Sequence, residues 1–96
     1  MKREDVLQRL RESYDSLLKF KVRSLAIFGS VARDEAMPEG DVDILVEFEG
    51  RTTFDLYMGL KNFLEDLLGC PVDLLTHKGI RSELRPFIER EIIYVS

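Results

Sequence analysis

Short apolar runs of strand length alternate along this chain with segments in which apolar residues recur every three or four positions, as in amphipathic helices. This alternation restricts the fold more than any other feature. Val22–Phe28 and Val42–Phe48 are short runs dominated by apolar and β-branched residues, which is typical of buried strands. Pro71–Thr76 is a shorter run of the same kind. Because segments of helical period lie between and around these runs, we predict an α/β domain with a mostly buried sheet.

Apolar residues spaced three or four apart mark the helices of this domain. Asp5–Phe20 has this spacing, and so does a long segment that either Thr52 or Thr53 can cap. Gly69 stands where the glycine that ends a helix belongs. The remaining predicted elements are a brief helix at Val31–Ala36, a turn at Gly40, a helix at Arg81–Arg90 and a strand at Ile92–Val95. In the Arg81–Arg90 helix, Leu84, Phe87 and Ile88 are expected to face inward, and Pro86 favours a position in the first turn.

Composition and charge indicate one small globular domain spanning residues 1–96. The chain is 45% hydrophobic and 33% charged, and its net charge of −4 argues against a general nucleic-acid-binding surface, which needs clustered Lys and Arg. No apolar run approaches the roughly 20 residues that span a bilayer, and the charged N-terminus is unlike a signal peptide. The single Cys70 cannot form an internal disulfide, which is typical of proteins of the reducing cytoplasm. We therefore expect a cytoplasmic protein and, because the chain lacks a long apolar run, no membrane partner.

Three aspartates occupy strand positions where apolar residues are expected. Asp41 and Asp43 flank Val42 at the start of the second strand, and Asp73 lies within the third. Residues two apart in a strand face the same side, so Asp41 and Asp43 project together, and Asp73 joins them if the two strands are neighbours. Converging carboxylates repel one another unless a cation holds them, which favours Mg²⁺ or Mn²⁺. Two such ions can align the attacking and leaving oxygens of phosphoryl transfer.

Each aspartate also has an ordinary structural interpretation. An Asp-x-Asp pair at a strand entry is by itself more often a solvated turn, and Asp73 alone suits a strand at the edge of a sheet. The metal-site interpretation depends on the three residues occurring together.

Gly29-Ser30 follows the first strand and opens a short predicted helix. Free backbone N–H groups at such a junction attract phosphate, glycine permits close approach, and the Ser30 hydroxyl can donate another hydrogen bond. A plain tight turn is the alternative interpretation. Arg33 could reach a phosphate, brace a carboxylate such as Glu35 or Asp41, or form a surface ion pair.

Other residues with chemical potential have simpler explanations. His77 and Lys78 follow the third strand and could contact a nucleotide or an acceptor, although a lone histidine in a loop is usually solvated. Cys70 is expected to act as a small buried hydrophobe. Three aromatic residues recur at helical spacing and are predicted to belong to the core: Phe54, Tyr57 and Phe63.

Together these motifs resemble the DNA polymerase β-like nucleotidyltransferase superfamily. Gly29-Ser30-Val31-Ala32-Arg33, followed by Asp41-Val42-Asp43-Ile44-Leu45-Val46, is similar to its signature. The short chain and Val72-Asp73-Leu74-Leu75 resemble its minimal nucleotidyltransferase (MNT) branch. The family often has serine where this chain has Gly40 and glycine where it has Asp34, and neither departure removes a metal ligand. The resemblance implies a single nucleotidyltransferase-type domain with a small mixed β-sheet flanked by helices.

The resemblance also implies a role for each site residue. Gly29 and Ser30 would hold the β- and γ-phosphates of ATP, with Arg33 nearby as a further nucleotide contact. Asp41 and Asp43 would bind both of two divalent ions. Asp73 would complete the second metal site and help to deprotonate the acceptor hydroxyl, which attacks the α-phosphorus and releases pyrophosphate.

The resemblance further implies a partner. MNT proteins are typically encoded beside a small helical HEPN protein, as the antitoxin of a toxin–antitoxin pair that transfers AMP to a tyrosine of the HEPN toxin. The chain has no second domain to hold an acceptor, so a hetero-oligomer or a homodimer is expected. Two alternatives are a non-catalytic module that occludes its partner, for which the charge of −4 could complement a basic ribonuclease, and nucleotidyl transfer to a small molecule.

Overall fold

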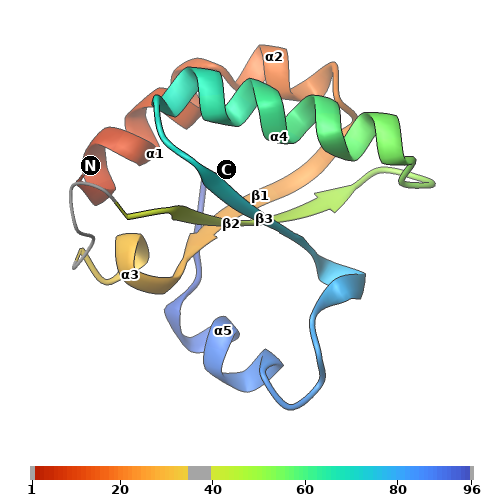
Figure 1. The fold of residues 1–96 in the computed structure, drawn as a ribbon. Helices are drawn as coiled ribbons and strands as arrows, with labels where there is room; N and C mark the ends of the chain where they lie inside the picture. The colour runs from red at the N-terminus through yellow and green to blue at the C-terminus, as the bar shows by residue number, and fades with distance from the viewer. Residues whose placement is uncertain (1, 35–39, 96) are drawn as a thin grey trace.

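A mixed sheet forms the centre of the computed structural model, which describes residues 2–34 and 40–95 (Figure 1). Its strand order is β3-β2-β1-β4. β1 (Val22–Phe28) is antiparallel to both β2 (Val42–Phe48) and β4 (Ile93–Tyr94), whereas β2 and β3 (Val72–Thr76) are parallel. The predicted small mixed sheet with flanking helices is therefore confirmed.

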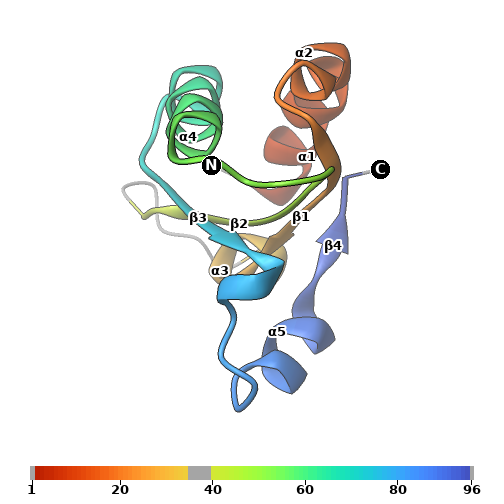
Figure 2. The same ribbon diagram turned by 90° about the vertical axis from the view of Figure 1, so that its right-hand side faces the viewer.

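The helices cover the two faces of the sheet unequally (Figures 1 and 2). One face is covered by α1 (Arg3–Glu12), α2 (Tyr14–Leu18) and α4 (Phe54–Leu68). On the other side lie α3 (Gly29–Ala32), the 3₁₀ turn η1 (His77–Gly79) and α5 (Arg85–Glu91). The second face is thus the more open one. Within the described residues, no helix is both long and apolar enough to span a bilayer.

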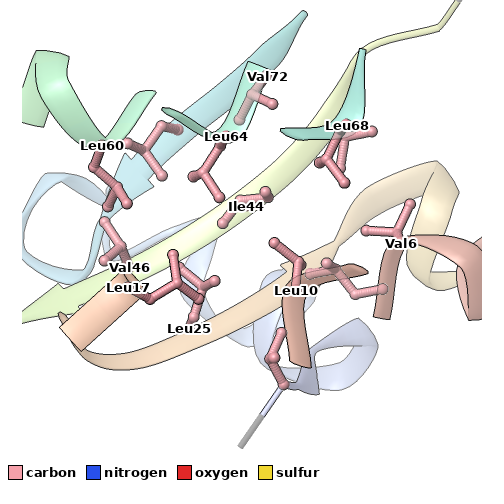
Figure 3. Packing of buried hydrophobic residues seen from close by; sticks show 14 of the residues in the cluster. Val6, Leu10, Leu17, Leu25, Ile44, Val46, Leu60, Leu64, Leu68 and Val72 are labelled. Carbon is pink, nitrogen blue, oxygen red and sulfur yellow. The ribbon is translucent and has the colours of Figure 1, made fainter. Parts of the chain in front are cut away.

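The hydrophobic core fills the space between the sheet and the covering helices. Figure 3 shows Leu60, Leu64 and Leu68 of α4 facing Ile44 and Val72 of the sheet. The three leucines recur every four residues, so they form one apolar stripe along the helix. All five side chains are at most 3% exposed, and burying each contributes about 1.5–3 kcal/mol.

Several element boundaries agree with the sequence predictions. β1 and β2 span the predicted residues. Thr53 caps α4 by accepting a hydrogen bond from the Leu56 amide at 3.1 Å, and Gly69 ends the same helix in the left-handed conformation (φ 71°). Pro86 lies in the first turn of α5, where its missing N–H is not needed.

Other boundaries differ from the predictions. The helix predicted over Asp5–Phe20 is divided, because Ser13 (φ −100°, ψ 14°) leaves helical geometry between α1 and α2. The helix predicted over Val31–Ala36 begins earlier, at Gly29, and its predicted end lies outside the described residues. The third strand begins at Val72 and the last one spans Ile93–Tyr94.

The prediction of inward-facing apolar residues was wrong at two places. Leu84 and Phe87 are 51% and 64% exposed, and Ile88 is only partly buried, because α5 lies on the open side of the sheet, where none of the described elements forms a second layer over it. Phe54 is 76% exposed at the first residue of α4, whereas Tyr57 and Phe63 pack partly buried against the core.

Candidate functional site

Strand register brings Asp43 and Asp73 side by side on the open face of the sheet. The two residues are paired across the parallel strands β2 and β3. Their sequence neighbours Val42, Ile44 and Val72 point into the core, so the aspartates point the other way. Asp41 precedes β2, is exposed, and lies close enough for its charge to act on Asp43.

Asp43 also lies directly against the turn that joins β1 to α3. A Cβ atom at Gly29 would overlap Oδ2 of Asp43, and Gly29 adopts a left-handed backbone conformation (φ 70°). Both features require glycine at this position. Gly29 is therefore adjacent to Asp43, and the partly buried Ser30 follows it in the chain.

The pKa of the Asp43 carboxyl is raised above its ordinary value of 3.8. Partial burial is the largest cause, followed by the negative charges of Asp73 and Asp41 and by a hydrogen bond with the Asp73 side chain. The positive charge of Arg33 opposes these effects. Negative charge is thus concentrated at this point of the sheet, and a bound cation would relieve the repulsion.

The chemistry of these side chains fits a divalent cation. Carboxylate oxygens are the ligands that Mg²⁺ and Mn²⁺ prefer. The close pair is Asp43 and Asp73. Over residues 2–34 and 40–95, no three His, Cys, Asp or Glu side chains are grouped closely enough to hold a metal ion as they stand.

Arg33 forms an ion pair with a residue of α5. Its Nη1 lies 2.7 Å from Oε2 of Glu91, and both side chains are about half exposed (44% and 39%). Of the predicted partners, Glu35 lies outside the described residues. The interaction with Glu91, which the sequence analysis missed, links α3 to the far C-terminal helix.

Asp34 has a backbone conformation that glycine adopts more easily than other residues do. Its φ of 59° is left-handed, which costs most residues energy but is tolerated by aspartate. Oδ1 of Asp34 accepts a hydrogen bond from the Arg3 backbone N–H at 3.2 Å, and Arg3 Nη1 donates to the Ala32 carbonyl oxygen at 3.2 Å. These contacts fasten the start of α1 to the end of α3.

A separate cleft of about 440 Å³ lies at the opposite ends of β2 and β3. Its lining includes Glu47, Thr76, His77 and Lys78, and none of the three aspartates. Glu47 lies four positions after Asp43 in β2, about 13 Å along the strand. His77 and Lys78 therefore line a cleft, as residues that contact a ligand would. This cleft does not include Ser30 of the predicted phosphate site.

Comparison with known sequences identifies the family. The pattern of the nucleotidyltransferase domain matches residues 7–95. A provisionally named protein adenylyltransferase of Methanocaldococcus jannaschii is 45% identical over 80 residues, which cover 80% of each chain. Protein adenylyltransferase MntA of Thermococcus cleftensis is 40% identical over 77 residues, which cover 80% of this chain and 78% of that protein.

Solved structures show the same fold. A provisionally named minimal nucleotidyltransferase matches with a TM-score of 0.82 and 39% identity, over 97% of this chain and 95% of that chain. A chain of the complex between a tri-AMPylated Shewanella oneidensis HEPN toxin and its MNT antitoxin matches with a TM-score of 0.62 and 20% identity, over 93% of this chain and 71% of that chain. The predicted enzyme class, a nucleotidyltransferase, is confirmed by these matches. By its sequence pattern, its relatives and its fold, this chain belongs to the nucleotidyltransferase domain family.

Proposed function

We propose that this protein transfers AMP from ATP to a hydroxyl, most naturally a tyrosine hydroxyl, of a HEPN-type toxin and so acts as its antitoxin. The observation that carries the proposal is the position of Asp43, between the Gly29 turn and Asp73. The names of the relatives support protein adenylylation, and the shared fold with a chain of the AMPylated toxin complex supports the pairing with a HEPN protein.

The triphosphate would be held by the Gly29-Ser30 turn. Amide groups in the first turn of a helix have no partner within the helix, and the Ser30 hydroxyl adds a further donor. The positive charge of Arg33, which already acts on Asp43, would act on a phosphate placed beside that carboxylate. We assign the β- and γ-phosphates of ATP to this turn.

Asp41, Asp43 and Asp73 would hold Mg²⁺ or Mn²⁺, with two ions serving the reaction. Divalent ions held there would neutralise the charge of the phosphates and align the attacking and leaving oxygens. The chain itself has to position the two substrates, because phosphoryl transfer needs little covalent chemistry from the protein.

Asp73 would receive the proton of the acceptor hydroxyl. As the acceptor oxygen bonds to the α-phosphorus, the bond from that phosphorus to the bridging oxygen breaks and pyrophosphate leaves. Asp73 suits this task because it is exposed, whereas Asp43 is partly buried against Gly29. A base within reach of the acceptor typically contributes about 10²- to 10⁴-fold to the rate.

The test is transfer of label from ATP labelled at the α-phosphate, with Mg²⁺ and a purified HEPN protein as the acceptor. Asp43→Asn and Asp73→Asn should each lower the rate at least about 100-fold. Asp66→Asn is the matched control, because Asp66 is an exposed aspartate of α4 on the opposite side of the sheet. An unlabelled HEPN protein after incubation with the unaltered enzyme would contradict the proposal.

Neutralisation of the partner by occlusion is the second candidate. The exposed side chains of Leu84 and Phe87 favour it, because they offer a binding surface that requires no chemistry. The Asp41→Ala/Asp43→Ala double variant separates the two candidates. If this variant still neutralises the toxin, binding alone is the function.

A further inference from the structure

The C-terminal helix α5 presents apolar side chains that no described part of the chain covers. Leu84 and Phe87 are 51% and 64% exposed, and α5 itself contains no buried residue. Tyr94, just beyond the helix, is 51% exposed. A single exposed leucine is ordinary, but large apolar side chains gathered in one segment of a small domain are typical of an interaction site. We call the surface formed by Leu84, Phe87, Arg81 and Arg90 the α5 surface.

The α5 surface borders the candidate site. Figures 1 and 2 show α5 and α3 on the same side of the sheet, away from α1, α2 and α4. The 2.7 Å ion pair between Arg33 and Glu91 links the two helices, and α3 begins with the Gly29-Ser30 turn. A protein that lies on α5 would therefore lie next to the face that carries Asp43 and Asp73.

The charge around α5 has the opposite sign to that of the chain. Residues 77–91, which reach the end of α5, contain four basic and three acidic side chains, whereas the whole chain contains 14 and 18. One of the three acidic residues, Glu91, is paired with Arg33 of the neighbouring segment. Arg81 and Arg90 have no ion-pair partner in the part of the chain that the structure describes. A surface with apolar anchors and excess positive charge complements an acidic, partly apolar partner.

The same charge argues against a second copy of this chain as the occupant. A two-fold symmetric contact sets a surface against itself. The α5 surface would then bring its excess of basic side chains together, and like charges in an interface are unfavourable.

We propose that the α5 surface docks the protein that carries the acceptor hydroxyl, through an acidic and apolar patch of that protein. Leu84 and Phe87 are the anchors, and Arg81 and Arg90 select the charge of the partner. Docking there delivers the acceptor to the open face of the sheet beside Asp73. This inference rests on the proposed function, because it supplies the acceptor for that reaction.

The first test measures binding to the purified HEPN protein by titration calorimetry. Leu84→Gln/Phe87→Gln should weaken binding at least about 30-fold, as truncation of interface anchors does. Phe54→Gln is the matched control: Phe54 is 76% exposed, but it lies on α4 across the sheet, so this variant should bind as the unaltered chain does. Both variants replace exposed side chains and should keep the thermal midpoint and the affinity for ATP.

The second test addresses charge. Arg81→Glu/Arg90→Glu should slow association with the HEPN protein and reduce the dependence of that rate on salt. An association rate and salt dependence equal to those of the unaltered chain would contradict the assigned role of the arginines.

Three results would overturn the docking proposal. The first is that the Leu84→Gln/Phe87→Gln variant binds the HEPN protein as tightly as the unaltered chain does. The second is that the unaltered chain forms no complex with it. The third is that the unaltered chain sediments as a dimer and this variant as a monomer, which would assign the surface to a second copy of the chain. Label transfer is measured on the same samples. A complex that forms without label transfer contradicts the proposed function and leaves the docking surface standing.

Discussion

Asp43 and Asp73 are direct neighbours on the parallel strands β2 and β3, and the negative charge of Asp73 helps to raise the pKa of the Asp43 carboxyl. When both carboxyl groups are ionised, their negative charges share one face of the sheet and repel each other. At neutral pH this repulsion lowers the stability of the folded protein. A cation bound between the two carboxylates would remove the repulsion.

Replacing Asp43 should change how stability depends on pH. Its folded-state pKa is raised above 3.8, so the folded protein binds this proton more tightly than the unfolded chain does. The unaltered protein therefore gains stability as the pH falls from neutral through the raised pKa towards 3.8, and loses that gain as the pH rises. Asp43→Asn lacks this ionisation and should be the more stable of the two at pH 7.

Thermal unfolding of both proteins, with a chelator present, measures this effect from about pH 7 to about pH 4. The stability advantage of Asp43→Asn should shrink as the pH falls. Parallel curves over this range would show that the folded structure does not raise the pKa of Asp43.

Gly29→Ala should be more harmful than the same change at another left-handed glycine. Gly50 is the matched control, because its φ is 78° and a Cβ there would meet nothing within 4 Å. Gly50→Ala should cost about 1–2 kcal/mol of unfolding free energy, the cost of a left-handed alanine. Gly29→Ala carries that cost and also displaces Asp43, so it should unfold at a lower temperature and lose transfer activity.

A double-mutant comparison isolates the contact between positions 29 and 43. In an Asp43→Ala background, Gly29→Ala should cost no more than Gly50→Ala, because the overlapping carboxylate is gone. Equal costs for the two glycine variants in the unaltered background would show that Gly29 is needed for its backbone conformation alone.

Glu91→Gln should loosen α5 more than it destabilises the whole protein. The ion pair with Arg33 is partly exposed, and such pairs contribute about 0.2–1 kcal/mol. Since α5 buries no residue of its own, this pair is one of its few contacts with the rest of the domain, beside the hydrogen bond from Arg85 Nη2 to the His77 carbonyl oxygen at 3.4 Å. Hydrogen exchange at the α5 amides should accelerate, while exchange in β2 stays unchanged. Glu89→Gln, an exposed change in the same helix, should leave both rates unchanged.

Leu64→Ala should remove a large part of the stability of the domain. Leu64 is 0% exposed at the centre of the α4 stripe, and truncation of a buried leucine costs about 2–5 kcal/mol. Leu18→Ala, at a site that is 50% exposed, should change the unfolding free energy by about 0.5 kcal/mol or less. Urea denaturation measures both, and similar midpoints would contradict the described core.

Local patterns in the sequence determined the strands and the long helix. The apolar runs of β1 and β2, a cap at Thr52 or Thr53 and the Gly69 C-terminus were predicted because each depends on residues a few positions apart, and the structure selects Thr53 as the cap. The period of a strand likewise sets Asp43 on the side of β2 opposite to its neighbours Val42 and Ile44. These features follow from backbone geometry, which each short segment carries by itself.

Tertiary structure alone decided which distant residues meet. The order β3-β2-β1-β4 sets Asp73 against Asp43, and the path of the last segment sets Glu91 against Arg33. The exposure of Phe87 also depended on this path, because an amphipathic helix has the same periodicity whether its own chain covers the apolar face or leaves it for a partner. Local periodicity determines which way a side chain faces along its element, whereas packing over the whole chain determines what lies in front of it.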